Sequence, residues 1–276
     1  MPVPDPFVSV IVPTRDRPAQ LAACLETLDR MDYPRERFEV IVVDDAGGEG
    51  PAAARNRGAA RARGDLLAFT DDDCRPGRGW LRALVDAWAG DPELAIGGRT
   101  ANGLPRNAFA AASQTVVDLV YAHYNGNGRG PRFFASNNLA VPARGFAAIG
   151  GFDERFRAAE DRDFCARWLA SGRRLASARR AFVEHAPGLT LAGYCRRHFA
   201  YGRGAYRYHR ARPGSVARSV RSELRFHRAL PSLVRPELAR LDGRGAASLA
   251  GLLAAWQAAN ALGFAWEALT APKSRS

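Results

Sequence analysis

Three short apolar runs, each followed by polar or acidic residues, constrain the fold of this chain more than any other feature. The runs cover 7–12, 38–43 and 66–70, and they are followed by Pro13-Thr14-Arg15, Asp44-Asp45 and Asp71-Asp72-Asp73. Helical patterns over 18–28 and 52–63 separate them. This alternation predicts a mostly parallel sheet with helices on both faces. Because ligands bind at the carboxyl ends of such strands, we expect the three polar groups to lie together at a binding edge.

The rest of the chain is less regular, and it becomes wholly helical and basic after residue 190. The patterns predict a helix over 79–89, a strand over 94–97, a helix over 107–124, a glycine-rich loop over 125–131, extended segments over 133–141, a helix over 160–171 and a strand over 181–184. We therefore predict an α/β domain over residues 1–190 and a basic, helical C-terminal region over residues 191–276.

An ordinary globular composition excludes several classes of protein. With 47% hydrophobic and 25% charged residues over 276 positions, the chain is not collagen-like, a coiled coil or wholly disordered. Its four cysteines lie far apart with no CxxC spacing, and the N-terminus lacks the pattern of a secretory signal. We therefore expect a cytoplasmic protein with free thiols rather than a disulfide scaffold.

The net charge of +12 is concentrated in the C-terminal region. Residues 1–190 carry about +1 and residues 191–276 about +11. Arginines are interspersed with aromatic residues over 191–228, a pattern that suits an anionic membrane surface, a docking partner or nucleic acid. An uncharged run over 245–266 is long enough to span a bilayer, but its modest apolarity favours a helix packed on the body or on a partner.

Three consecutive aspartates after a buried strand repel one another unless a cation or hydrogen-bond donors compensate their charge. Mg²⁺ commonly uses one or two carboxylates together with substrate phosphates. Asp71 and Asp73 could therefore serve a ribose hydroxyl and a metal that bridges a diphosphate. The alternative is a solvated acidic turn or an N-cap for the helix near Trp80. The two further polar groups expected at the same edge favour the binding site.

Two common nucleotide-binding folds are excluded by their motifs. The position after the first strand reads PTRDRP instead of GxGxxG, and no GxxxxGK[ST] occurs. Asp44-Asp45 could accept hydrogen bonds from a base or a ribose. Glu160-Asp161 opens the helix over 160–171, where acidic residues interact favourably with the helix dipole. The other interpretation is a general base that takes a proton from an acceptor hydroxyl.

Five blocks in one order and spacing resemble the family 2 glycosyltransferases of GT-A fold. They are VSVIVPTRDRPAQLAACLETL, VIVVDDAGG, ARNRGAARARGDLLAFTDDD, SNNLAVPARGFAAIGGFDERF and AAEDRDFCARWLASG, and they lie within residues 7–190. The resemblance implies a Rossmann-like, mostly parallel sheet and transfer of a sugar from a UDP-, GDP- or dTDP-sugar to a hydroxyl acceptor. It further implies that transfer inverts the configuration at the anomeric carbon of the sugar and that the reaction uses a divalent cation, Mg²⁺ or Mn²⁺. The family's usual D-D-G-S is here Asp44-Asp45-Ala46-Gly47, which puts a serine contact in question.

The resemblance also assigns roles to the matching positions. Those expected to bind the nucleotide sugar are Pro13, Thr14, Arg15, Asp45, Arg55, Asn56, Asp71 and Asp72. Those expected to bind the metal are Asp73, Asp71 and His185, although a structural role suits His185 equally well. Those expected on the acceptor side are Ser136, Asn137, Asn138, Gly151, Phe152, Asp153 and Glu154. The expected catalytic pair is Glu160 and Asp161, with Asp161 as the general base.

Two alternatives to this function remain at the level of sequence. A sugar-1-phosphate nucleotidyltransferase would need a glycine-rich, arginine-bearing loop after the first strand, which is missing. A catalytically silent protein that binds membranes or anionic polymers through its tail would not need Asp71, Asp73 and Asp161. With a sugar-transferring domain attached, we favour a peripheral position at the inner face of a membrane that carries lipid-linked acceptors. Nucleic acid and a single transmembrane helix are less favoured.

Overall fold

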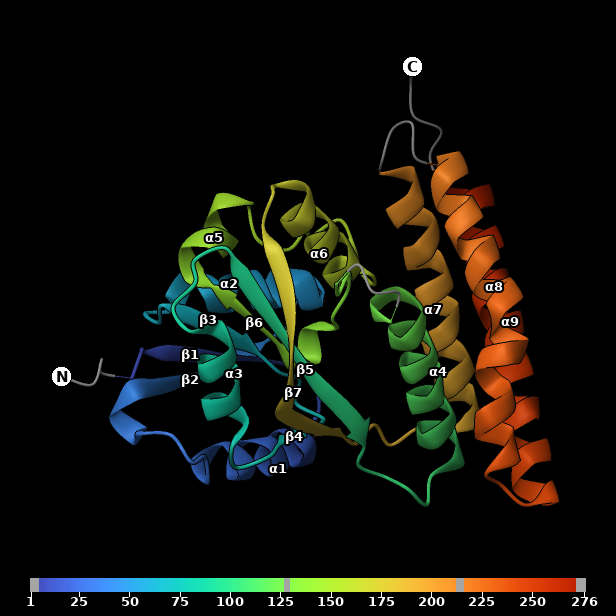
Figure 1. The fold of residues 1–276 in the computed structure, drawn as a ribbon, viewed down its shortest axis with the longest axis horizontal. Helices are drawn as coiled ribbons and strands as arrows, with labels where there is room; N and C mark the ends of the chain where they lie inside the picture. The colour runs from blue at the N-terminus through green and yellow to red at the C-terminus, as the bar shows by residue number, and fades with distance from the viewer. Residues whose placement is uncertain (1–4, 127–129, 212–215, 272–276) are drawn as a thin grey trace. The chain divides into compact units, whose positions relative to one another are not determined.

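Two compact units make up the protein in this computed structural model, which describes residues 5–126, 130–211 and 216–271 (Figure 1). The first, here called the sheet unit, consists of Met1–Gly103, Tyr124–Arg155 and Glu160–Pro187. The second, the helical unit, consists of Leu104–His123, Phe156–Ala159 and Gly188–Ser276. The chain therefore passes between the units more than once. The division at residue 190 into a catalytic domain and a basic region stays a prediction.

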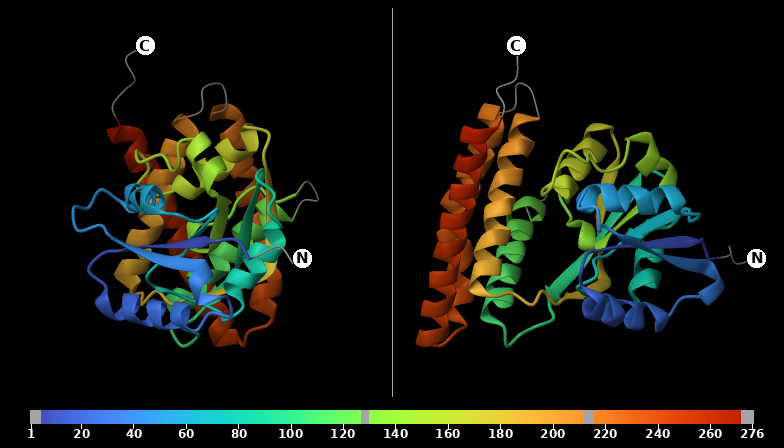
Figure 2. Two further views of the ribbon diagram at one scale, coloured as in Figure 1. Left: turned by 90° about the vertical axis from the view of Figure 1, so that its left-hand side faces the viewer. Right: turned by 180° about the vertical axis from the view of Figure 1, so that it is seen from behind.

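A seven-stranded sheet forms the centre of the sheet unit, in the order β2-β1-β3-β6-β5-β7-β4 (Figures 1 and 2). The strands are β1 (Val8–Thr14), β2 (Phe38–Asp44), β3 (Leu66–Phe69), β4 (Cys74–Pro76), β5 (Leu94–Asn102), β6 (Leu139–Pro142) and β7 (Arg174–His185). β1 pairs in parallel with both β2 and β3, as the alternation of strands and helices predicts. In the β1–β2 register Thr14 lies beside Asp44, so the carboxyl ends of these two strands are level.

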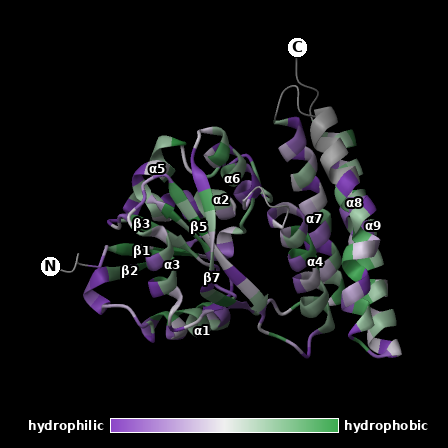
Figure 3. Ribbon diagram, in the orientation of Figure 1, coloured by the Kyte–Doolittle hydropathy of each residue, from purple (hydrophilic) through white to green (hydrophobic). Residues whose placement is uncertain are grey.

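Side chains of β1 alternate between the two faces of the sheet, and different helices cover each face. Val8, Val10 and Val12 belong to one core cluster with buried residues of α1 (Pro18–Asp29) and α3 (Trp80–Trp88). On the opposite face, a Cβ at Gly58 of α2 (Pro51–Arg61) would lie 2.5 Å from Ile11 Cγ2. The predicted helices on both faces are thus confirmed, around strands that are predominantly hydrophobic (Figure 3).

Beyond β3 the sheet is mixed rather than mostly parallel. In the described part of the chain, β6 pairs antiparallel with β3 and β5, and β4 pairs antiparallel with β7, whereas β5 and β7 are parallel. The prediction of a mostly parallel sheet therefore holds around β1 and needs correction here. β6 enters from the 3₁₀ turn η2 (Ser136–Asn138) and β4 from the turn of the three aspartates, and both strands are too short to carry a periodic signal.

β7 is longer than the predicted strand over 181–184, because it begins at Arg174 and covers 12 residues. Its first half carries exposed arginines instead of a continuous apolar run, which hides the strand from the sequence pattern. The remaining regular elements of this unit are the 3₁₀ turn η1 (Arg35–Arg37), α5 (Ala143–Ala148) and α6 (Glu160–Ala170). The start of α6 confirms the helix predicted from residue 160.

Four helices contribute to the helical unit, and all lie where the sequence predicts helices. They are most of α4 (Ala108–Asn125), α7 (Leu191–Arg210), α8 (Val216–Ala239) and α9 (Gly243–Thr270). Their common core consists of Ala112, Val116, Leu119, Tyr194, Phe226, Leu230, Leu253 and Trp256. In the ranges that the structure describes, no helix combines the length and hydropathy that crossing a membrane requires.

Glycines bring the backbones of α7 and α9 into close contact. A Cβ at Gly202 of α7 would lie 2.0 Å from the carbonyl oxygen of Asn260. A Cβ at Gly263 of α9 would lie 2.0 Å from the carbonyl oxygen of Phe199. Both neighbours are backbone atoms, which cannot turn aside as a side chain can, so any larger residue at either position must push the helices apart.

A buried carboxylate joins the same two helices. Arg203 Nε and Arg207 Nε, both on α7, donate hydrogen bonds of 2.7 and 2.6 Å to Glu267 of α9. Burial opposes ionisation of Glu267, but the hydrogen bonds from Arg207 and Arg203 outweigh it and hold its pKa below the usual value. The ionised carboxylate therefore fixes α7 against α9 at neutral pH.

This packing involves part of the basic and aromatic segment predicted over 191–228. Tyr194, His198 and His209 are buried, and Arg203 and Arg207 are bound to Glu267. These residues of the segment therefore serve contacts within the helical unit, whereas Leu191 and Tyr201 are exposed.

We expect Gly263→Ala to destabilise the helical unit by about 1–3 kcal/mol, because its Cβ would press on the Phe199 carbonyl. The matched control is Gly251→Ala on the same helix, where a Cβ meets no atom within 4 Å and should add up to about 1 kcal/mol of stability through helix propensity. Urea and thermal unfolding followed by circular dichroism measure both changes. Equal effects of the two substitutions would contradict the close approach.

Candidate functional site

The polar groups that follow β1, β2 and β3 lie together at one edge of the sheet. The Thr14 hydroxyl donates to Asp72 Oδ2 at 2.9 Å, and the Asp45 backbone N–H donates to the Thr14 carbonyl at 2.9 Å. Thr14 thus contacts the residues that follow both neighbouring strands. Pro13 and Thr14 are partly buried, whereas the next residue, Arg15, is exposed.

Each of the three consecutive aspartates has its own cationic or donor partners. Asp71 Oδ1 accepts a 2.6 Å hydrogen bond from Arg55 Nη2. Arg17 Nη1 lies 3.2 Å from both Asp72 Oδ1 and Asp73 Oδ2, so it bridges the second and third carboxylates. Burial raises the pKa of Asp72, even though Thr14 and Arg17 oppose this shift. The cluster is therefore compensated in part by two arginines, one on either side.

Asp45 closes a loop in front of α2. Its carboxylate is buried and accepts hydrogen bonds of 3.1 Å at both oxygens from the Gly50 backbone N–H, one residue before the helix begins. Arg57 Nη2 lies 3.8 Å from Asp45 Oδ1. The guanidinium of Arg15 lies over Gly48, whose φ of +66° favours glycine and where a Cβ would be 3.1 Å from Arg15 Nη1. Asp45 and Arg15 thus flank the same glycine loop.

Arg55 connects the aspartate cluster to α6. Its guanidinium is buried, with only 3% of the residue exposed, and Nη1 donates to Glu160 Oε1 at 2.9 Å while Nη2 donates to Asp71. Burial disfavours the charged guanidinium, but Asp71 and Glu160 outweigh it and raise the pKa of Arg55. Its Nε is buried without a hydrogen-bond partner in the described structure. Arg55 is therefore a permanent cation between two carboxylates.

Asp161, next to Glu160, has an environment that favours the protonated carboxyl. Burial, together with the negative charge of Glu160, raises its pKa to about 7. Backbone N–H groups of Arg162 and Ser136 donate to its two oxygens at 2.7 and 3.3 Å, and these bonds and Arg55 oppose the shift without cancelling it. A carboxylate whose pKa lies near neutral pH can accept and release a proton under ordinary conditions.

The acceptor-side segment that begins at Ser136 is buried, and its members do different work. The Ser136 backbone supports Asp161. Asn138 donates 3.0 Å hydrogen bonds to the carbonyls of Arg99 and Ala181 and accepts a 2.9 Å bond from Trp80 Nε1, so its amide is wholly engaged inside the protein. Asn137 is also buried, and its Oδ1 has no hydrogen-bond partner in the described structure. Within this segment we find no reason to assign Asn138 a direct substrate contact.

Asn56 holds the second acceptor-side loop, Gly151–Glu154. Its Nδ2 donates to the Phe152 carbonyl and to Glu154 Oε1, each at 2.8 Å, and its Oδ1 accepts from the Phe152 backbone N–H at 2.9 Å. Asp153 lies in the same loop and binds Arg155. The geometry makes Asn56 a clamp on this loop, where the resemblance alone suggested a lining of the nucleotide pocket.

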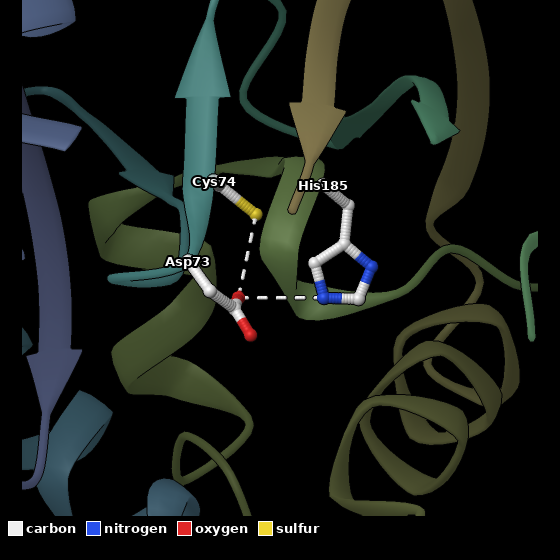
Figure 4. A group of neighbouring side chains, drawn as sticks. All are labelled: Asp73, Cys74 and His185. Carbon is white, nitrogen blue, oxygen red and sulfur yellow. Dashed lines mark hydrogen bonds and ion pairs between the residues drawn. The ribbon is translucent and has the colours of Figure 1, made fainter. Parts of the chain in front are cut away.

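A group of possible metal ligands lies where the aspartate turn meets the end of β7. Ligand atoms of Asp73, Cys74 and His185 all lie within 4.8 Å of one another, and Asp73 Oδ1 is 3.3 Å from His185 Nε2 (Figure 4). The register explains this, because β4 and β7 pair with Cys74 opposite His185. Asp71, which the sequence also predicts as a ligand, is outside this group and bound to Arg55.

The chemistry of these donors fits a divalent cation with few protein ligands. Burial raises the pKa of the Cys74 thiol well above its usual value, and sulfur is a soft donor that Mg²⁺ and Mn²⁺ do not favour. A carboxylate oxygen of Asp73 and an imidazole nitrogen of His185 remain, and both donor types suit Mn²⁺. Mg²⁺ and Mn²⁺ sites with few protein ligands leave positions for substrate phosphates.

The sequence motifs do not single out Arg17, Arg57 or Trp80, although all three contact candidate site residues. Arg17 could have been found, because it lies two residues after Arg15 in a segment expected to face three carboxylates. Trp80 bonds to Asn138 across 58 positions in the sequence, and no local pattern reports such a contact.

Comparison with known proteins gives consistent matches. The family model for glycosyl transferase family 2 matches residues 46–149. A pre-mycofactocin glycosyltransferase of Mycobacterium tuberculosis is 26% identical over 225 residues, which cover 72% of this chain and 46% of that protein. The glycosyltransferase AglE of Haloferax volcanii is 30% identical over 131 residues, 38% of this chain and 43% of that one. The chain thus spans about half the length of the curated relatives that it matches.

Two solved structures share the fold. The mannosyltransferase PcManGT from Pyrobaculum calidifontis, in complex with GDP-Man and Mn²⁺, has a TM-score of 0.62 at 21% identity, covering 95% of this chain and 88% of that one. GalNAc-T7 with UDP, GalNAc and Mn²⁺ has a TM-score of 0.52 at 15% identity, covering 80% of this chain and 54% of that one. The match to the family 2 model, the relatives and this architecture together support the resemblance to family 2 glycosyltransferases, and the chain has the GT-A fold.

Proposed function

We propose that this protein transfers a sugar from a nucleoside-diphosphate donor to a hydroxyl acceptor, with Asp161 as the general base. The observation that carries the proposal is the buried Arg55, whose guanidinium binds Asp71 in the aspartate turn and Glu160 beside Asp161. It ties a carboxylate cluster suited to a metal and a diphosphate to a carboxyl group with a pKa near neutral. Sugar transfer needs both features, because the leaving group is anionic and the nucleophile must lose a proton.

Asp161 takes the proton of the acceptor hydroxyl as that oxygen attacks the anomeric carbon. The bond from this carbon to the diphosphate oxygen breaks on the opposite face, so that a single displacement inverts the configuration. Glu160 orients Arg55, and its charge adds to the basicity of Asp161. Asp73 and His185 would hold a divalent cation, Mg²⁺ or Mn²⁺, which supplies positive charge to the departing diphosphate.

The other site residues keep the roles that the resemblance implies, with two refinements from the geometry. We propose contacts to the nucleotide sugar from Pro13, Thr14, Arg15, Asp45, Arg55, Asp71 and Asp72. We propose that Asn56 acts by holding Gly151–Glu154, and that Asn138 supports Ser136 and Asn137 from within the core. The two structural neighbours contain GDP-Man and UDP with GalNAc, which supports a nucleotide-sugar donor. The candidate donors are UDP-, GDP- and dTDP-sugars.

The alternative of a catalytically silent binding protein is not favoured. It does not explain why buried Arg55 and Glu160 are arranged around Asp161, and the two relatives described above are named as glycosyltransferases. A cytoplasmic position remains part of the proposal. It agrees with four cysteines that are free thiols in the structure.

Asp161→Asn should abolish sugar transfer and leave donor binding unchanged, because the amide cannot accept the proton. The charge of Asp161 is disfavoured in the folded state, so removing it should not lower the midpoint of thermal unfolding at pH 8. Product formation, calorimetric titration with nucleotide sugar and thermal unfolding test these points. Asp86→Asn, at an exposed position of α3, controls for the loss of one carboxylate. Loss of donor binding together with turnover would refute the assignment of the base.

The rate of transfer should rise with pH through about 7, because Asp161 must be deprotonated to act as a base. Glu160→Gln removes the neighbouring negative charge, so the pKa of Asp161 should fall and the acid limb of kcat/KM should move to lower pH. The side chain amide keeps an oxygen that can accept from Arg55. An unchanged acid limb in this variant would contradict the electrostatic coupling of the two carboxyl groups.

Asp73→Ala should remove the dependence of nucleotide binding on a divalent cation. His185→Ala should lower the affinity for the cation by about 10–100-fold. Cys74→Ser should have little effect, because the buried thiol is a weak ligand. Titration of each variant with UDP, GDP and dTDP, in the presence of Mn²⁺ and then of EDTA, measures these effects and identifies the nucleobase of the donor. Metal-dependent binding that survives in Asp73→Ala would place the ion elsewhere.

A further inference from the structure

The solvent-facing side of α9 carries almost no charge. Over Gly243–Thr270 the charged residues are Arg244, at the first turn, and Glu267, which is buried and bound to α7. At 1.5 Å per residue this 28-residue helix is about 42 Å long, so nearly its whole length presents an uncharged face. Surfaces that meet water are normally rich in charged residues, so an uncharged face of this length indicates a partner.

Three large apolar side chains extend from the C-terminal half of this face. Leu262 is 64% exposed, Trp266 is 55% exposed and Leu269 is 86% exposed. Steps of four and three residues place them on one side of the helix. The N-terminal half of the exposed face is built from small residues, among them Ala247, Gly251, Ala254 and Ala258. The helix therefore presents a slender apolar ridge that ends in two leucines and a tryptophan.

The neighbouring helix supplies positive charge without carboxylate partners. α8 and α9 share one core, in which Phe226 and Leu230 of α8 lie with Leu253 and Trp256 of α9. Away from that core, α8 exposes Arg225, Arg228 and Arg235. None of these three arginines forms an ion pair within the described part of the chain.

Charge decides between the two occupants that an apolar helix face could have. A second copy of the chain would bring together two C-terminal regions that each carry about +11, which repel one another at physiological ionic strength. An anionic lipid surface instead attracts the arginines while the apolar ridge leaves water. Tryptophan also favours the boundary between headgroups and acyl chains, because its ring is amphipathic.

We propose that α9 and the exposed arginines of α8 form a docking surface for an anionic membrane. Leu262, Trp266 and Leu269 enter the boundary between headgroups and acyl chains, and Arg225, Arg228 and Arg235 meet lipid phosphates. The helix lies in the plane of the interface. This surface shares no residue with the sugar-transfer site, so the inference does not depend on the proposed function.

The fluorescence of Trp266 offers a direct test. The other four tryptophans, Trp80, Trp88, Trp168 and Trp256, are buried, so quenching from the lipid reports on Trp266. With vesicles of phosphatidylcholine and phosphatidylglycerol, we expect a blue shift of the emission and quenching by brominated acyl chains. Pure phosphatidylcholine vesicles should bind at least about tenfold more weakly. Trp266→Phe should remove the quenching but keep the protein in the vesicle pellet.

Variants separate the two parts of the surface. Leu262→Glu with Leu269→Glu should weaken vesicle binding at least about tenfold, as charge resists entry into the interface. The matched control, Ala192→Glu with Ala200→Glu, adds the same charge at exposed positions of α7 and should bind more tightly than that variant. A variant with Arg225→Gln, Arg228→Gln and Arg235→Gln should lose the preference for anionic lipid. Thermal unfolding and nucleotide-sugar titration verify that each variant is folded and keeps its donor site.

Two results would overturn the proposal. One is unchanged Trp266 emission and no pelleting with anionic vesicles. The other combines two findings: the unmodified protein does not bind vesicles, and light scattering shows a dimer in solution that Leu262→Glu with Leu269→Glu converts to a monomer. The partner of the apolar ridge would then be a second copy of the chain. Failure of nucleotide-sugar binding in the unmodified protein would count against the proposed function alone.

Discussion

The buried guanidinium of Arg55 is the constraint on which the candidate site depends. A charge removed from water is tolerated only when opposite charge and hydrogen bonds compensate it, and here Asp71 and Glu160 do so. These two carboxylates come from the turn after β3 and from the first residue of α6, 89 positions apart by their numbers. One cation thus fixes the distance between the cluster proposed for the diphosphate and the helix that carries Asp161. Removing it would leave two carboxylates in a poorly solvated place without a partner.

The same arrangement separates the tasks of neighbouring acidic groups. Asp71 and Glu160 both accept hydrogen bonds from the permanent cation of Arg55. Asp161 is half-buried beside the charge of Glu160, and in the described part of the chain its hydrogen-bond donors are two backbone N–H groups; desolvation and Glu160 raise its pKa to about 7. A pair of adjacent carboxyl groups with different environments is a common way to obtain a base that works at neutral pH. Both side chains end in a carboxyl group, and their different surroundings give them different roles.

Sequence patterns predicted the site better than the architecture around it. Polar residues after parallel strands must meet at one edge, so the proximity of Thr14, Asp45 and Asp72 followed from the strand order alone. β4 could not be found, because three residues carry no period, and although β6 lies largely in the extended region predicted over 133–141, its antiparallel pairing depends on distant strands. Asn138 was expected on the acceptor side, and only the tertiary structure reveals that its amide bonds to Trp80, Arg99 and Ala181. The short segment Phe156–Ala159 belongs to the helical unit although sheet-unit residues flank it, which no composition change marks.

The C-terminal region illustrates why charge and aromatic content alone do not locate a surface. Arginines and aromatic residues are interspersed over 191–228, yet several of them serve contacts between helices: Arg203 and Arg207 bind Glu267, and Tyr194 donates to the Leu252 carbonyl at 2.9 Å. The less conspicuous run over 245–266 instead leaves one side of α9 uncovered, because the glycines that let α7 approach lie on the other side. A helix that is buried on one side and carries almost no charge on the other has apolar area in contact with water. The exposed arginines of the neighbouring α8 are the reason why we propose an anionic lipid surface, rather than a second copy of the chain, as the partner of this area.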